Sequence, residues 1–465
     1  MFMRKMTILF LLAFSFVQAQ QKITLENIFT DDTFRENSME AFHPMRNGDF
    51  FTLLNYDGNV ISLDKYDYAT LTKTETIVSS ADLGLPSFDS YTFDQDETKV
   101  IIGTNTESIF RHSELADFYV YDMVTRKFEK ISEHKIQEPT FSPDGKKVAF
   151  AFENNLFVKD LVSGKTAQIT YDGEKNKIIN GITDWVYEEE FSFVRAFDWN
   201  GNSDKIAFIR FDETEVPVFS MDMYGDELYP GQLVFKYPKA GENNSIVSLH
   251  LYDLTSNQLK KVALGNDQQY YIPRIQWTSE PNTLAVTTLN RHQNNLNLLF
   301  VNGSTLESHL VHNEKDAAYV DITDDLTYLK DNSFIWTSEK DGYNHIYHYS
   351  SSGKLINQIT KGDWEVTNYY GYDDSTKRLF YQSVEDGSTN RTIYSIKLNG
   401  KDKKRLSSSS GTNSAAFSNS FNYYINTYSD AGTPPIYTLN EAKSGKQLKE
   451  IKNNKWLTEK LSNYN

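Results

Sequence analysis

Apolar and polar residues alternate along most of the chain, in short runs that turn residues separate. The clearest unit covers residues 139–150, 155–160 and 164–169. A Pro-Asp-Gly turn separates its first two runs, and a Ser-Gly turn separates its last two. The pattern predicts a unit of four antiparallel strands.

Degenerate copies of this unit recur along the chain. Their turn-like segments lie at residues 47–51, 96–100, 199–207, 276–285, 330–335, 372–380 and 417–424. With the clearest copy they make about eight units, spaced by roughly 40–60 residues, which is typical of a β-propeller. We therefore predict an all-β fold, a β-propeller of about eight four-stranded antiparallel blades over residues 20–448.

The fourth unit departs from the repeat at residues 181–190, where Gly-Ile-Thr-Asp-Trp-Val-Tyr-Glu-Glu-Glu predicts a short helical insertion. Either Thr183 or Asp184 is a suitable N-cap. A long excursion, from about residue 212 to 244, then interrupts the unit, and insertions of that length usually carry function or a contact surface. Continued helical spacing would place four residues on one face, with Glu189 beside it: Val186, Glu190, Phe193 and Phe197.

Two carboxylates leaning toward an apolar interior are costly unless a cation meets them there. The charge pattern alone favours a solvated acidic helix face. Across the chain, 63 acidic residues against 47 basic ones give a net charge of -16. This balance argues against nucleic acid and anionic membranes as partners and favours cationic ligands.

The first 19 residues are typical of a signal peptide. Arg4 and Lys5 precede an apolar run at 6–16, and small residues at 17–19 predict cleavage near Ala19. An uncleaved anchor is the alternative, but the run is too short to span a bilayer. We therefore expect an exported protein, periplasmic or extracellular, without a membrane anchor. The chain has no cysteine, which excludes disulfides and a cysteine-linked lipid.

Several motifs in order along the chain resemble the dipeptidyl peptidase IV family of serine exopeptidases. The 181–190 segment resembles its double-glutamate motif, and Phe110-Arg-His-Ser113 resembles its arginine-bearing segment. Further matching segments lie at residues 118–122, 211–217, 237–241, 289–294, 342–347 and 359–366. The chain is therefore identified as similar to the N-terminal propeller of that family.

The resemblance implies a site for the free α-ammonium of a peptide. Glu189 and Glu190 would bind the ammonium, and Arg111 would reach into the same cleft. Glu188 is expected to point outward or to contact local structure, and His112 to be structural. We expect no cofactor and no metal, since the His-x-x-His pairs at 309–312 and 345–348 lie in strand-like repeats.

In this family an α/β-hydrolase domain follows the propeller, and residues 449–465 resemble a short linker toward it. The sequence has no Gly-x-Ser-x-Gly motif, so we expect no catalytic residue and no peptidase activity from this chain alone. The predicted function is substrate recognition and gating in an enzyme that releases N-terminal X-Pro or X-Ala dipeptides. Alternatives are the propeller of a prolyl tripeptidyl peptidase and a free-standing exported propeller that binds or scaffolds. Expected partners are peptides with a free N-terminus and the hydrolase domain, and a homodimer is left open.

Overall fold

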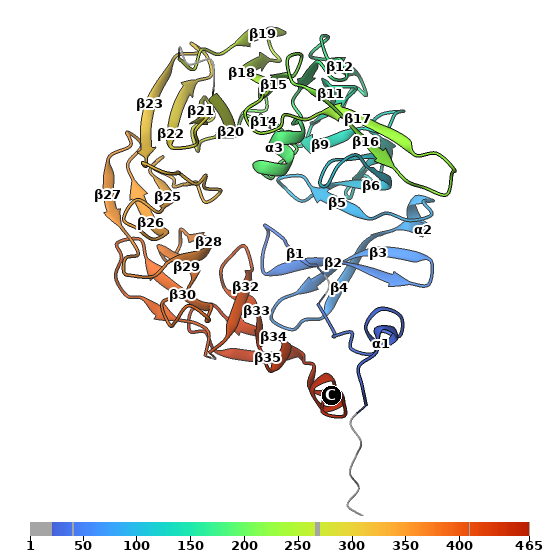
Figure 1. Cartoon of the computed structure of the whole chain (residues 1–465), viewed down its shortest axis with the longest axis vertical. Helices are drawn as coiled ribbons and strands as arrows, with labels where there is room; N and C mark the ends of the chain where they lie inside the picture. The colour runs from blue at the N-terminus through green and yellow to red at the C-terminus, as the bar shows by residue number, and fades with distance from the viewer. Residues whose placement is uncertain (1–20, 40, 266–269, 409, 465) are drawn as a thin grey trace, which may run out of the picture.

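The computed structural model describes residues 21–464, apart from residues 40, 266–269 and 409. The predicted signal peptide, residues 1–19, lies outside the described residues. In the described part, the strands form eight antiparallel sheets around a ring and one separate two-stranded hairpin (Figure 1). This arrangement confirms the predicted eight-bladed propeller.

Each blade except the fourth is formed by strands that are consecutive in the sequence. Blades one to three contain β1 (His43–Pro44), β2 (Phe50–Asp57), β3 (Val60–Asp67), β4 (Lys73–Ser79), β5 (Ser90–Phe93), β6 (Lys99–Ser108), β7 (Glu114–Asp122), β8 (Phe128–Lys130), β9 (Gln137–Phe141), β10 (Lys147–Phe152), β11 (Asn155–Asp160) and β12 (Thr166–Gln168). Blade four contains five strands: β13 (Ile178–Asn180), β14 (Phe197–Trp199), β15 (Lys205–Asp212), β18 (Ile246–Asp253) and β19 (Gln258–Lys261).

The other four blades contain four strands each. They are β20 (Tyr270–Trp277), β21 (Thr283–Asn290), β22 (Asn295–Asn302), β23 (Ser308–Lys315), β24 (Thr327–Tyr328), β25 (Phe334–Ser338), β26 (His345–Tyr349), β27 (Leu355–Gln358), β28 (Val366–Asp373), β29 (Arg378–Ser383), β30 (Thr392–Lys397), β31 (Lys404–Arg405), β32 (Thr412–Phe417), β33 (Tyr423–Asp430), β34 (Thr433–Glu441) and β35 (Gln447–Lys452). A short helix, α2 (Ser80–Leu83), follows blade one.

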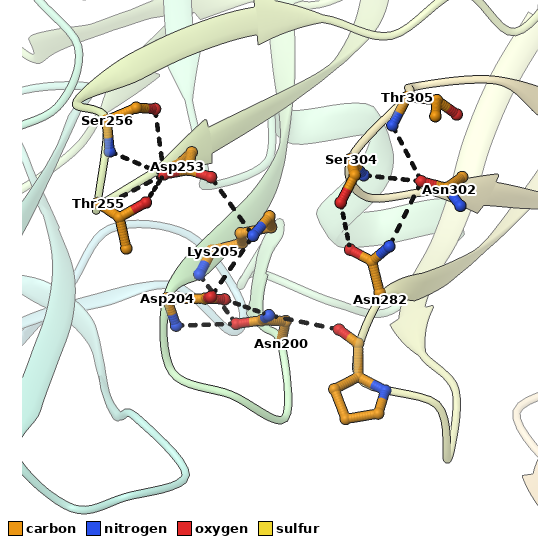
Figure 2. Close-up of polar contacts among 11 residues, drawn as sticks. Asn200, Asp204, Lys205, Asp253, Thr255, Ser256, Asn282, Asn302, Ser304 and Thr305 are labelled. Carbon is orange, nitrogen blue, oxygen red and sulfur yellow. Dashed lines mark hydrogen bonds and ion pairs between the residues drawn. The ribbon is translucent and has the colours of Figure 1, made fainter.

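In blades one to five, the same kind of side-chain cap stabilises the turn after one strand. That strand is β3, β7, β11, β18 or β22, the third in the order of its sheet. In each, an Asp or Asn that ends the strand accepts a hydrogen bond from the backbone N–H three residues later, at 2.7–2.9 Å. Figure 2 shows two of these turns, at Asp253 and Asn302. Such short polar side chains favour a turn because they replace a backbone acceptor. The five capping residues are Asp67, Asp122, Asp160, Asp253 and Asn302.

Polar contacts also join the turns within blade four. The Asn200 side chain accepts hydrogen bonds from the backbone N–H groups of Asp204 and Lys205, at 3.0 and 2.8 Å (Figure 2). The Lys205 ammonium lies 3.3 Å from the Asp253 carboxylate, so the turn before β15 contacts the one after β18. These contacts fix the strands that carry the insertions of this blade.

The ring closes through side chains, since none of the sheets in the described part combines strands from both ends of the chain. The Asn422 amide donates to the Asp49 carboxylate at 2.9 Å. Burial of apolar surface supplies the driving force for the closure. The buried cluster between blades one and eight contains Phe51, Tyr68, Ile425 and Leu439.

The two ends of the described chain lie side by side. The Gln21 N–H donates to the Asn463 carbonyl at 2.7 Å. Gln21 precedes α1 (Leu25–Phe29), and Asn463 follows α4 (Lys455–Leu461). The expected domain boundary at residue 448 falls inside β35, which pairs with β34, so blade eight ends at Lys452.

Blade four carries both interruptions that the sequence indicated. The Glu motif forms α3 (Trp185–Glu190), at the inner margin of the ring (Figure 1). The excursion forms a hairpin, β16 (Val218–Met223) and β17 (Gly231–Lys236), which we call the arm.

The predicted apolar helix face was wrong beyond Glu190. The helix ends there because Ser192 has a φ of 57°, which a right-handed helix cannot accommodate. Phe197 instead begins strand β14.

Candidate functional site

Helix α3 begins at a buried carboxylate. Asp184 is its N-cap and accepts a hydrogen bond from the Tyr187 N–H at 3.0 Å. The Ser245 hydroxyl donates to the second carboxylate oxygen at 2.5 Å. Burial raises the pKa of Asp184, which these two hydrogen bonds partly oppose. The cap therefore joins the start of the helix to the segment that follows the arm.

Tyr187 fixes the helix against two blades. Its side chain is buried, and its hydroxyl accepts a hydrogen bond from the Ile272 N–H in blade five at 2.9 Å. Its ring packs edge-on against Phe211 of blade four, with centroids 4.8 Å apart. These contacts anchor α3 to blades four and five.

The first glutamate of the motif, Glu188, contacts backbone groups of a neighbouring segment and does not line the cavity that holds the other two glutamates. Glu188 is 1% exposed, and its Oε1 accepts hydrogen bonds from the backbone N–H groups of His112 and Ser113 at 2.7 and 2.9 Å. Two charge-assisted hydrogen bonds stabilise a buried carboxylate. Glu188 thereby holds in place the segment that contains Arg111, from a distant part of the chain.

Glu188→Ala is expected to lower the free energy of unfolding by about 2–4 kcal/mol, because two buried backbone donors lose their acceptor. Glu188→Gln keeps an acceptor oxygen and should lose less. Urea unfolding measures the effect, with Glu190→Ala as the control, since Glu190 is exposed and should change stability by about 0.5 kcal/mol or less. Equal losses for the two alanine variants would contradict this role for Glu188.

The second and third glutamates line a cavity of about 900 Å³ between α3, the arm and blade five. Arg111 Nε lies 3.2 Å from Glu189 Oε2, and the Glu189 side chain is only 16% exposed. Glu190 is exposed and lines the same cavity. The structure therefore brings Arg111 and Glu189 into contact and places Glu190 beside them.

These carboxylates stand at the C-terminal end of α3, where the free carbonyl groups already carry partial negative charge. The last turn of the helix contains no basic residue. The Arg111 side chain is 71% exposed, so its ion pair with Glu189 is screened by water and contributes little stability. The arrangement can accept hydrogen bonds from a further cation.

Other residues, which were not assigned to the site from the sequence, also line this cavity. Trp185 and Tyr237 pack together with ring centroids 4.4 Å apart, and Tyr237 follows directly after the arm. Arg291 reaches the cavity from blade five, where its guanidinium donates to the Glu242 carbonyl. The match of residues 237–241 to the family motif was the only signal for Tyr237.

Among the residues that the structure describes, no group of three or more His, Cys, Asp or Glu side chains could hold a metal ion. Within the same residues, no helix combines the length and the apolar character that crossing a membrane requires.

Comparison with known proteins agrees with the fold and the motifs. Residues 94–435 match the model of the "Dipeptidyl peptidase IV (DPP IV) N-terminal region". The chain therefore belongs to the dipeptidyl peptidase IV family, as its N-terminal propeller region.

The individual relatives match most of this chain, but only part of their own length is covered. A probable dipeptidyl peptidase 4 of Emericella nidulans is 28% identical, over 88% of this chain and 55% of its own length. Human prolyl endopeptidase FAP is 28% identical, over 83% of this chain and 54% of its own length. The crystal structure of Porphyromonas gingivalis dipeptidyl peptidase 4 superimposes with a TM-score of 0.91 at 38% identity, over 96% of this chain and 64% of that one. The chain thus spans about half the length of the curated relatives it matches.

Proposed function

We propose that this chain is the substrate-recognition and gating propeller of a dipeptidyl peptidase IV-like exopeptidase. The observation that supports this most is the placement of Glu189 and Glu190 on one cavity, with Arg111 in contact with Glu189. In this proposal the two carboxylates bind the α-ammonium of a peptide.

The chemistry of the site suits an ammonium. An ammonium has three donors, and two carboxylates accept them while they balance its charge. Arg111 orients Glu189 and offers its remaining N–H groups to a peptide carbonyl. A blocked or internal residue would leave the carboxylates without a cation, so the site would measure a peptide from its N-terminus.

In the complete enzyme, residues 449–465 would lead to an α/β-hydrolase domain that cleaves after the second residue of the bound peptide. The names of the relatives, dipeptidyl peptidase 4 and prolyl endopeptidase, support a proline-directed peptidase. A tripeptidyl peptidase would use the same ammonium site with a deeper cavity. Export after cleavage near Ala19 is part of this proposal.

A homodimer is also part of the proposal, with the arm as its contact surface. The arm and its loop expose large apolar side chains, including Tyr224, Leu228 and Tyr229, each at least 80% exposed. Apolar surface gathered on a projecting hairpin is typical of a contact between proteins. Light scattering of the purified chain measures its oligomeric state.

Calorimetric titration of residues 20–465 tests the recognition. A Gly-Pro-containing tetrapeptide with a free N-terminus should bind at least about tenfold more tightly than its N-acetylated form, because acetylation removes the charge and two donors. Neither peptide should be cleaved, since hydrolysis needs a nucleophile, a base and oxyanion donors from the other domain. Equal affinity for the two peptides would contradict the proposal.

A further inference from the structure

A second cavity, of about 930 Å³, lies on the other side of α3, beneath the arm. It is bounded by the turn between β6 and β7, the turn between β10 and β11, residues 173–176, α3 and β17. Arg111, Glu189 and Glu190 do not line it. Its size is in the range of pockets that hold small molecules.

A largely buried carboxylate lines this cavity without a hydrogen-bond partner among the described residues. Glu213 is 6% exposed, and no hydrogen bond from the described residues reaches its carboxylate. Polar groups in a side chain buried to this degree are nearly always paired, so an unpaired carboxylate on a cavity indicates a ligand.

Asp184, Glu188 and Glu213 line one part of the cavity, which we call its acidic end. Lys135, Lys175 and Lys236 also line the cavity, and of these Lys236 acts electrostatically on Glu213. The Lys236 ammonium already donates to the carbonyl groups of Thr214 and Val216, at 3.1 and 2.7 Å. At the acidic end the carboxylates therefore outnumber this ammonium, which favours a positively charged occupant.

Aromatic rings form the wall opposite these carboxylates. Phe110 and Phe235 lie with ring centroids 5.5 Å apart, and Trp185 and Phe235 lie 6.4 Å apart. Aromatic faces bind both the apolar body of a ligand and an adjacent cation.

We propose that this cavity binds a small primary amine with an apolar body, whose ammonium contacts Glu213. The arylalkylamines are the chemical class that matches the acidic end, the aromatic wall and the volume. This cavity shares Trp185 and Phe235 with the peptide cavity, but Glu213 does not line the peptide cavity, so the proposal does not depend on the proposed function.

Binding should release a proton near neutral pH. Burial, together with the charges of Asp184 and Asp212, raises the pKa of Glu213 to about 7, although Lys236 opposes the rise. A bound ammonium favours the ionised carboxylate, so the proton leaves Glu213 as the amine binds. Close to one proton should be released at pH 6 and close to none at pH 8.

Titration calorimetry of residues 20–465 with 2-phenylethylamine tests the proposal. Repeating the titration in two buffers with different ionisation enthalpies gives the number of protons released on binding. We expect binding that 2-phenylethanol, a neutral analogue of the same shape, does not reproduce. Glu213→Gln should weaken the amine at least about tenfold and abolish the proton release. Thermal melts establish that the variant folds.

Glu189→Gln separates this site from the peptide site. It should leave amine binding and proton release unchanged, even if the peptide experiment fails. Amine affinity that falls in Glu189→Gln but not in Glu213→Gln would overturn the proposal and assign the amine to the peptide site. Absence of amine binding, or equal affinity for the neutral alcohol, would also overturn it.

Discussion

Replacement of Glu189 with glutamine is expected to lower the affinity for a peptide with a free N-terminus by about 10- to 150-fold. This corresponds to the loss of one charge-assisted hydrogen bond, worth about 1.5–3 kcal/mol. The glutamine keeps the shape of the side chain, but it lacks the charge that opposes the ammonium. It also loses the ion pair with Arg111, which lies 3.2 Å away in the wild type.

The matched control for this variant is Glu227→Gln, which removes the same charge from an exposed position in the loop of the arm. Titration calorimetry at one ionic strength compares the two variants, since long-range attraction depends on salt. Equal losses would show that net charge, rather than the ammonium site, carries the affinity.

Glu213→Gln is expected to change how stability depends on pH. Burial raises the pKa of Glu213 from its ordinary value of 4.5 to about 7 in the folded chain. Between these values the folded chain keeps a proton that the unfolded chain loses, so wild-type stability falls as pH rises through this window. The fall reaches about 3 kcal/mol by pH 8.

Glutamine cannot ionise, so the Glu213→Gln variant does not lose this part of its stability as the pH rises. The free energy of unfolding of Glu213→Gln, relative to wild type, should therefore rise by about 3 kcal/mol between pH 4 and pH 8. Denaturant unfolding at a series of pH values measures the difference. Glu215→Gln changes an exposed neighbour two residues later and is the control. Its free energy of unfolding relative to wild type should not change with pH. A flat difference for Glu213→Gln would contradict a raised pKa at this position.

The blades were predictable because the interactions that define them are local. Alternation assigns each strand its buried face, and a short polar residue such as Asp160 caps a turn three residues long. The order of the strands follows the order in the sequence in every blade except the fourth, where β13 and β14 both pair with β15. Local pattern therefore defined both the number and the type of the blades.

The ends of elements were less predictable. The spacing of Phe193 and Phe197 fits a helix, but the positive φ of Ser192 ends the helix before they are reached. Tertiary packing selects that conformation, because Phe197 pairs within blade four. Sequence spacing alone does not contain this information.

The site was predictable only where a motif marked it. Glu189 and Arg111 are 78 positions apart, and only the resemblance joined them. The partners of Glu188 were out of reach because they are backbone N–H groups, which carry no sequence signal. Glu213 was missed for a related reason, since its burial depends on how the arm folds over the cavity.

A double-mutant cycle tests the central claim, that Glu189 and Glu190 bind the ammonium of a peptide. It combines wild type and Glu189→Gln with a tetrapeptide in its free and N-acetylated forms, and calorimetry gives four affinities. If the carboxylate contacts the ammonium, acetylation should weaken the wild type strongly and the variant little, with a coupling energy of at least about 1.5 kcal/mol. Additive losses, with a coupling energy near zero, would contradict the account.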